Sequence, residues 1–354
     1  YKFNLPVFRG RYAEALLARA LVRPGGVIAG NALFPSTRFH LQSGGAEVVE
    51  LPIPEAYDSR NQHPFKGDMD LDALRQALER RPVSAIYLEL CNNALGGHPV
   101  SLKNLREVQC LARRQGIPVV LDATRAFENA ALIREREDGC ADRSLTELVL
   151  EICLCSDATA SSLTKDFPAR AGAFIGTNRE DLFVAVRDLA ILAFGHHMDD
   201  AARSRLAGAL LVPPESAGGV AGRMGLVQQL WSELRAASVP VVEPVGGHAV
   251  YVDAAALLPH ISAAHYPGEA LANALYLAGG IRVAPNMSTP DQMQRGVRLV
   301  RLAIPVGRYG AGDLADIAGL FRAIVKNPES IQGLKQVHKP KGQLGEYIAQ
   351  YAPL

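Results

Sequence analysis

Several features that mark particular classes of protein are scarce in this sequence. The 354 residues contain only 5 cysteines, an odd number, which indicates a reducing compartment and not a disulfide-stabilised secreted fold. The 37 basic and 36 acidic residues are scattered and nearly balanced, which argues against nucleic-acid binding. No apolar run approaches the length of a membrane span, and no signal peptide is recognisable. We therefore expect a cytoplasmic protein that binds neither nucleic acid nor membranes.

The composition and length fit an ordinary globular protein with two domains. Apolar residues make up 48% and charged residues 21%, and a chain of this length can bury a large core. Residues 213–222, rich in proline, glycine and serine, are the best candidate for a domain boundary. The sequence therefore predicts a large domain over 1–215 and a smaller one over 216–354. Cys153 and Cys155 are spaced as C-x-C and not C-x-x-C, so no metal site is expected.

Strand and helix patterns predict an α/β fold. A buried strand over 83–90, a helix over 101–115 and a strand over 117–121 follow one another directly, which implies parallel pairing through a right-handed crossover. Further strands are expected at 26–29, 47–51, 152–155 and 173–176. The polar stretch 195–205 contains the pair His196 and His197, interpreted as loop residues or a subunit contact. Beyond the boundary an α+β pattern follows, with helices at 225–236, 268–278 and 311–326 and strands within 239–253 and 299–305.

The most informative residues are Asp122 and Lys165. Asp122 ends a probable buried strand, and Arg125 follows in the next turn. The carboxyl ends of parallel strands bind ligands, and a buried acid needs a cationic partner. One such partner is the ring nitrogen of pyridoxal 5'-phosphate (PLP), with Lys165 forming the Schiff base to its aldehyde. Lys165 lies between two predicted strands, although an exposed loop lysine is the ordinary alternative. The central hypothesis is therefore a PLP enzyme.

Two further segments are candidates for cofactor contacts. Arg9, Gly10 and Arg11 lie at the N-terminus of a predicted helix, where backbone N–H groups and the helix dipole favour a phosphate. An ordinary helix start with solvated arginines is an equal alternative. Phe34 follows the short strand at 26–29, where an aromatic ring can stack on a planar ligand or simply belong to the core.

Two polar residues are candidates for substrate contacts. Asn93 belongs to a loop with two asparagines and two glycines directly after a strand, a composition more typical of a ligand loop than of a plain connection. Arg301 alternates with apolar residues on a predicted strand. A buried arginine usually holds a carboxylate, and its planar guanidinium suits the α-carboxylate of an amino acid.

Longer motifs add a family resemblance. The chain resembles the tyrosine phenol-lyase and tryptophanase family, the β-eliminating lyases of PLP fold type I, along nearly its whole length. The matching stretches are residues 10–14, 65–71, 96–101, 122–130, 164–166, 242–250 and 300–305. The resemblance implies the PLP-dependent transferase-like fold, with a mostly parallel seven-stranded sheet in a large domain and a smaller α+β C-terminal domain. It also implies a homodimer or tetramer acting on a small amino-acid substrate.

The resemblance assigns a role to each candidate. Lys165, Asp122 and Arg125 would be catalytic: Lys165 as the Schiff-base lysine and proton acceptor from Cα, Asp122 as the partner of the pyridine nitrogen. Arg125 and Asn93 would contact the phenolic oxygen of PLP, and Phe34 its ring face. The phosphate would be held by Arg9, Gly10, Arg11 and Ser162. Arg301, with Asn93, would bind the substrate. The products of such an elimination are pyruvate, ammonia and the leaving group.

Three departures from the family pattern bear on cofactor binding and on the leaving group. Thr164 stands where the family has a second lysine, and Asn286 falls about where phenol-lyases place an arginine. The family's N-terminal portion, with a tyrosine that acts as general acid, does not appear. A thiol, with a pKa of about 8.5, leaves more readily without acid assistance than a phenol, with a pKa of about 10. These departures favour C–S cleavage of a cysteine S-conjugate.

Cysteine-lyase domains of modular polyketide synthases are similar to this family, so the chain is interpreted as a domain of that kind, whose substrate could be tethered to a carrier protein. Three alternatives stay open. The first is a C–C lyase of the tyrosine phenol-lyase or tryptophanase type. The second is another fold type I activity, such as aldol cleavage or transamination. The third is a degenerate lyase fold kept as a scaffold or docking domain.

Overall fold

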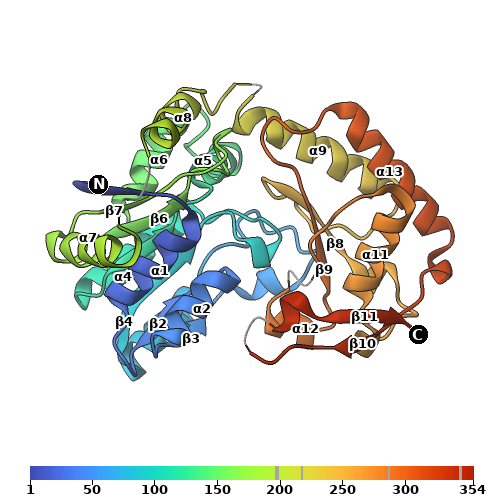
Figure 1. The fold of residues 1–354 in the computed structure, drawn as a ribbon, viewed down its shortest axis with the longest axis horizontal. Coiled ribbons are helices and arrows are strands. Elements are labelled where there is room, and N and C mark those ends of the chain that lie inside the picture. Colours follow the sequence, from blue (N-terminus) through green and yellow to red (C-terminus); the bar gives the residue numbers. More distant parts are fainter. Residues whose placement is uncertain (196–198, 217, 286–287, 343–344) are drawn as a thin grey trace.

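The N-terminal part of the protein is built around a seven-stranded sheet (Figure 1). The computed structural model describes residues 1–195, 199–216, 218–285, 288–342 and 345–354. The strands lie in the order β1-β7-β6-β5-β4-β2-β3. Their bounds are Phe3–Val7 (β1), Val27–Gly30 (β2), Glu47–Glu50 (β3), Val83–Glu89 (β4), Val119–Asp122 (β5), Ala158–Ser162 (β6) and Ala173–Thr177 (β7). Strands β3, β2, β4, β5 and β6 pair in parallel, whereas β7 and β1 pair antiparallel at one edge. The predicted mostly parallel sheet is confirmed.

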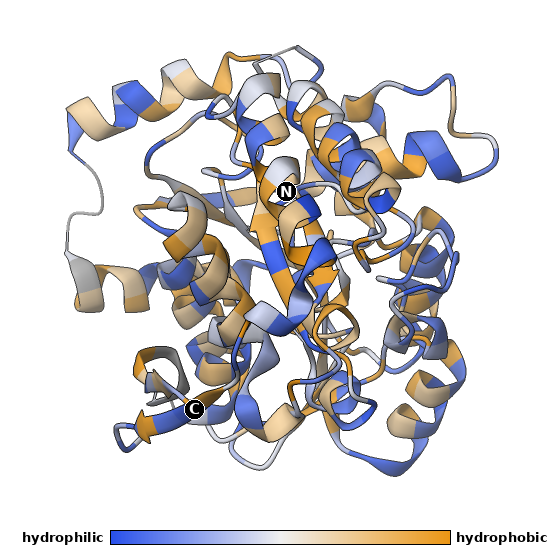
Figure 2. Ribbon diagram, turned by 90° about the vertical axis from the view of Figure 1, so that its right-hand side faces the viewer, coloured by the Kyte–Doolittle hydropathy of each residue, from blue (hydrophilic) through white to orange (hydrophobic). Residues whose placement is uncertain are grey.

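Side chains alternate between the two faces of the sheet along each strand, and helices cover both faces. On β4, Ile86 and Leu88 pack into one apolar cluster, and Ala85 and Tyr87 pack into the other. The first cluster is completed by α3 (Leu71–Arg80), α4 (Leu102–Arg114), α5 (Ala126–Arg136) and α6 (Leu145–Leu154). The second is completed by α1 (Gly10–Leu21), α2 (Pro35–Ser43) and α7 (Glu180–Phe194). Figure 2 shows the resulting concentration of hydrophobic residues on the central strands.

A second hydrophobic core lies in the C-terminal part of the chain. It gathers Val227 and Leu230 of α9, Val250 of β8 and Phe321 of α13. Strand β8 pairs antiparallel with β9, and β10 pairs antiparallel with β11. The bounds are Val220–Ala236 (α9), Ala249–Asp253 (β8), Ala254–Leu257 (α10), Pro267–Gly279 (α11), Pro290–Gln294 (α12), Leu299–Ala303 (β9), Ala311–Lys326 (α13), Leu334–His338 (β10) and Gln350–Pro353 (β11). The domain limits 1–215 and 216–354 stay a prediction.

Short 3-10 helices complete the described structure, at Pro54–Tyr57 (η1), Asn93–Leu95 (η2), Ala263–His265 (η3), Pro328–Ser330 (η4) and Gly345–Ile348 (η5). Among all the helices of the described residues, none combines the length and apolarity that crossing a bilayer requires.

The structure corrects one predicted strand. Residues 152–155 lie at the end of α6 and not in a strand, which begins only at Ala158. Ser144 and Glu147 form a capping box that starts α6, and Leu148 and Ile152 then face the core four residues apart. The short apolar run therefore belongs to a buried helix face, which strand-like composition alone cannot distinguish.

Two other predicted segments differ from the structure in their extent. Within the predicted polar stretch, Asp199 caps a helix, α8 (Asp200–Leu210), by accepting a hydrogen bond from the Ala202 N–H. In the region 239–253 only β8 forms a strand, while Val241 makes a single bridge to Val252. His196, His197 and Asn286 lie outside the described residues.

Candidate active site

Neighbouring strands deliver polar side chains to one edge of the sheet. Asp122 ends β5 and Glu89 ends β4, and the strand register places these two residues opposite each other. Lys165 lies in the turn between β6 and β7. Since β4, β5 and β6 are parallel, their carboxyl ends meet at the same edge, where α/β sheets bind ligands. The structure thus places Asp122 and Lys165 at the same edge of the sheet.

Asp122 is a buried acid with a neighbouring acid beside it. Its exposed fraction is 7%, and its Oδ1 accepts a hydrogen bond of 3.0 Å from the Thr124 N–H. Burial raises the pKa of Asp122, while the Thr124 hydrogen bonds, Arg125 and Lys165 oppose the rise. Burial and then Asp122 raise the pKa of Glu89 to about 8. Glu89 therefore holds its proton at neutral pH. A cation that binds beside the buried Asp122 would stabilise the carboxylate form of this acid.

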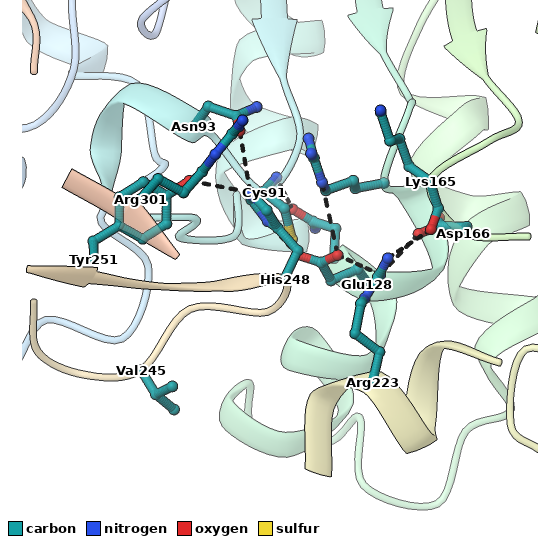
Figure 3. A network of polar contacts seen from close by, with 12 residues as sticks. Cys91, Asn93, Glu128, Lys165, Asp166, Arg223, Val245, His248, Tyr251 and Arg301 are labelled. Atoms are coloured by element: carbon teal, nitrogen blue, oxygen red, sulfur yellow. Dashed lines mark hydrogen bonds and ion pairs between the residues drawn. The ribbon is translucent and has the colours of Figure 1, made fainter. Parts of the chain in front are cut away.

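Lys165 lies among several cations, with Asp122 as a nearby acid. Burial, followed by Arg125 and Arg301, lowers the pKa of Lys165 to about 8, although part of the side chain is exposed in the open site. Its main-chain oxygen accepts a hydrogen bond of 2.6 Å from Arg223 Nη1, which anchors the turn (Figure 3). The neutral fraction of the amine near neutral pH is therefore far larger than for an ordinary lysine, as a nucleophile or a base requires.

The predicted phosphate residues converge where α1 begins. A Cβ atom added to Gly10 would lie 2.8 Å from the Ser162 Cβ, so the start of α1 is in close contact with the end of β6. Arg9 is the N-cap residue of α1 and, like Arg11, is exposed. Ser162 Oγ lies 3.1 Å from Thr164 Oγ1, so the departure from the family's second lysine places a hydroxyl beside this cradle.

The predicted substrate residues contact each other directly. Asn93 Oδ1 accepts a hydrogen bond of 2.5 Å from Arg301 Nη1, which joins the loop after β4 to β9. The Asn93 Nδ2 group donates to Glu89 Oε1 at 2.6 Å. The orientation of the amide is therefore fixed by Arg301 at its oxygen and by Glu89 at its nitrogen. Phe34 is the half-buried N-cap residue of α2, after β2 and at the same edge of the sheet. The ligand roles of these residues stay predictions.

A buried polar network lies behind these residues, and sequence reasoning did not single out its members. Glu128 Oε1 lies 2.8 Å from His248 Nδ1, and Glu128 Oε2 lies 2.5 Å from Arg223 Nη2. The same Arg223 Nη2 lies 3.3 Å from Asp166 Oδ1. Tyr251 OH lies 3.0 Å from His248 Nε2. Glu128 and His248 fall inside motifs that match the family, which was a usable signal, whereas Arg223 on α9 had none.

The turn that carries Asn93 begins with a strained residue. Cys91 has a φ of +47°, a left-handed conformation that residues other than glycine rarely adopt. Asn129 Oδ1 supports it by accepting a hydrogen bond of 3.2 Å from the Cys91 N–H. Burial raises the pKa of the Cys91 thiol well above its ordinary value, so this cysteine is not a nucleophile. Its conformation turns the chain so that Asn93 faces Arg301.

The residues present fit PLP. Asp122 is an acid suited to a protonated ring nitrogen, Lys165 is an amine suited to an aldehyde, and Gly10 packs against Ser162 to form an open cradle suited to a phosphate. The Nε atoms of Arg125 and Arg301 are buried without a hydrogen-bond partner among the described residues, so both guanidinium groups keep unused donors. When bound, PLP supplies an electron sink for negative charge at Cα. Among the same residues, no cluster of His, Cys, Asp or Glu could hold a metal ion.

Comparisons with known proteins agree with this chemistry. Residues 1–314 match the family model described as "Beta-eliminating lyase". The tyrosine phenol-lyase of Nostoc punctiforme is 34% identical, over 96% of this chain and 76% of that protein. The tryptophanase of Rhodobacter capsulatus is 36% identical, over 96% of this chain and 78% of that protein.

Solved structures show the same fold at lower identity. An archaeal alanine:glyoxylate aminotransferase has a TM-score of 0.65 at 18% identity and covers 91% of this chain and 75% of its own. A serine palmitoyltransferase from S. paucimobilis with bound PLP has a TM-score of 0.63 at 17% identity and covers 93% and 74%. The predicted family, the fold type I architecture and the PLP cofactor are confirmed. The chain belongs to the β-eliminating lyase family of PLP-dependent enzymes.

Proposed function

We propose that this protein catalyses β-elimination on an L-amino acid with PLP as cofactor. The observation that carries the proposal is the meeting of Asp122, Lys165 and Arg301 at one edge of the sheet. Arg301 and Asn93 bind the substrate α-carboxylate through charge-assisted hydrogen bonds. Lys165, with its lowered pKa, removes the proton from Cα. Asp122 would hold the protonated ring nitrogen of PLP, and the cofactor would then supply the electron sink that loss of the group on Cβ needs.

The relatives support an aromatic leaving group. Those described above are named tyrosine phenol-lyase and tryptophanase, and the identity extends over nearly the whole chain. On that basis we propose C–C cleavage of an aromatic amino acid as the first candidate reaction. Asn286 is the departure from the family pattern that argues against phenol as the leaving group, and it lies outside the described residues.

C–S cleavage of a cysteine S-conjugate is the second candidate reaction. Thr164, which replaces the family's second lysine, removes one cation from the phosphate side of the site. A thiol is also the better leaving group, since its pKa is lower than that of a phenol. Under this reading the substrate can be carried on a carrier protein. Under either reading we propose a homodimer or tetramer, which light scattering of the loaded protein would test.

One substrate panel separates these reactions. The PLP-loaded protein is incubated with L-tyrosine, L-tryptophan and S-substituted L-cysteines, and pyruvate, ammonia and the leaving group are quantified. Equal amounts of all three products establish β-elimination, and the best substrate identifies the leaving group. Transamination or aldol cleavage gives no such equality. A scaffold domain gives no product and no visible absorbance from bound PLP, and that result contradicts the proposal.

A further inference from the structure

We propose that Glu128 is a positioning residue that couples the carboxylate-binding side of the site to the turn that carries Lys165. The inference rests on the proposed β-elimination. Glu128 is completely buried on α5 and faces two groups from the C-terminal part of the chain, His248 and Arg223 (Figure 3). Neither of these groups was assigned a role from the sequence.

One arm of the network runs through His248 and fixes the position of its single ring proton. Burial and four nearby cations hold the pKa of His248 well below its ordinary value, so the ring is neutral. Burial raises the pKa of Glu128, while Arg223 and Arg125 oppose the rise. The ion pair with Arg223 at 2.5 Å assigns the carboxylate form to this side chain, and a carboxylate can only accept a hydrogen bond. The proton is therefore on Nδ1, 2.8 Å from Glu128 Oε1.

The other ring nitrogen then determines how the site residues share their hydrogen bonds. His248 Nε2 has no proton and accepts from the Tyr251 hydroxyl at 3.0 Å. Nε2 also lies 3.1 Å from Asn93 Oδ1 but does not donate to it. The donor at Asn93 Oδ1 is then Arg301 Nη1 at 2.5 Å, whereas a proton on Nε2 would add a second donor at this oxygen and remove the acceptor of the Tyr251 hydroxyl. Through His248, Glu128 thus determines how Asn93 and Tyr251 form hydrogen bonds beside the carboxylate-binding arginine.

The other arm runs through Arg223 to the lysine. Arg223 is 4% exposed, and its Nη2 lies 2.5 Å from Glu128 Oε2. Its Nη1 donates to the main-chain oxygen of Lys165 at 2.6 Å, and Nη2 also lies 3.3 Å from Asp166. Since one guanidinium holds both Glu128 and the lysine turn, a change in the Glu128 carboxylate moves the anchor of Lys165.

The successive contacts alternate between the two parts of the chain. Arg301, His248 and Arg223 come from the C-terminal part, and they contact Asn93, Glu128 and the Lys165 turn in the sheet-containing part. The two sides of the site therefore cannot shift relative to each other without disturbing this network. Glu128 is the residue that both arms share.

The first experiment measures the ring proton of His248 in the Glu128→Gln variant. Arg223 has only donors, so the amide oxygen of the new side chain turns to Arg223 and its NH2 group turns to His248 Nδ1. The proton is then forced onto Nε2. ¹⁵N NMR of histidine-labelled protein without PLP, assigned by difference against His248→Gln, reads this switch directly. We expect an Nδ1–H signal in the wild type and an Nε2–H signal in Glu128→Gln.

Matched variants make this result decisive. Glu151 also pairs with two arginines, Arg106 and Arg143, but lies on α6 away from the site, so Glu151→Gln should leave the His248 signals unchanged. Tyr251→Phe keeps the ring and removes only the hydroxyl, so it should keep the Nδ1–H form and shift the Nε2 signal to that of an unbonded nitrogen. This variant tests the assignment even if Glu128→Gln fails to fold. An Nε2–H wild type, or no Nε2 shift in Tyr251→Phe, overturns the His248 arm.

Kinetics of the loaded enzyme test the coupling itself. Glu128→Gln should raise KM, through Asn93 and Arg301, and lower kcat, through the Lys165 turn. We expect a loss of about 10- to 100-fold in kcat/KM, the range seen for the outer-shell partners of metal ligands. Changes in both parameters support the inference, whereas values equal to those of Glu151→Gln overturn it. If the wild type eliminates no substrate, the proposed function fails, and the NMR result still decides the His248 arm.

Discussion

Arg223 allows a quantitative test of how the site is held together. It is 4% exposed and contacts two buried carboxylates, Glu128 at 2.5 Å and Asp166 at 3.3 Å. Replacement by methionine keeps much of the apolar volume and removes the cation. Breaking a buried pair costs about 3 to 5 kcal/mol, because the remaining charge is left uncompensated. Asp166 can take up a proton, since burial raises its pKa to about 6, so we expect a loss near the lower limit, about 3 kcal/mol.

Urea unfolding of the protein without PLP, followed by circular dichroism, measures this loss. Arg134→Met is the matched control, because Arg134 pairs with Glu215 at 2.6 Å with its side chain 35% exposed. Such surface pairs typically contribute about 0 to 1 kcal/mol. The difference between the variants should shrink as the pH falls towards about 6, because loss of Arg223 raises the pKa of Asp166 further and its carboxyl then takes up a proton. Equal losses in the two variants would refute the reasoning from buried charge.

Three further predictions concern the cofactor. Asp122→Asn should still bind PLP, seen in its visible absorbance, but should lose at least about 10²-fold in kcat, because the amide cannot keep the ring nitrogen charged. The rate of PLP incorporation should rise with pH and level off above about 8, the pKa of Lys165; a rise that continues to the ordinary lysine value of about 10.4 would contradict the lowered pKa. Gly10→Ala should weaken PLP binding in equilibrium dialysis, because its Cβ would clash with Ser162, whereas Gly208→Ala, with no atom within 4 Å, should not.

Much of the candidate site was accessible from the sequence because its residues follow local rules. Asp122 ends an apolar run, and Arg301 interrupts one, so both positions are anomalous without any tertiary information. Lys165 was singled out by its place between two strands, although the first of them, predicted at 152–155, was wrong. The fold was predictable for the same reason, since strand, helix and strand follow in direct succession from 83 to 122.

The residues that the sequence did not reveal depend on contacts between distant segments. Arg223 looks like any solvated arginine on an amphipathic helix until α9 packs against α5, 95 residues away from Glu128 in sequence. Similarly, the 152–155 run reads as a strand until the capping box at Ser144 assigns it to a helix. Local sequence patterns predict which residues are buried, but they do not indicate which partner pairs with a buried charge.

The arrangement of the acids explains how Lys165 keeps a low pKa. Besides Asp122, three acids surround the site, and a further free carboxylate beside Lys165 would stabilise its ammonium form and raise the pKa. The structure instead engages them elsewhere: Glu89 with Asn93, Glu128 with Arg223 and His248, and Asp166 with Arg223 and the Phe127 N–H. Within the part of the chain that the structure describes, Lys165 has no ion-pair partner and faces arginines. The buried network therefore has an electrostatic function, because it engages these three acids with other groups and leaves Asp122 as the acid near the amine that must be neutral to react.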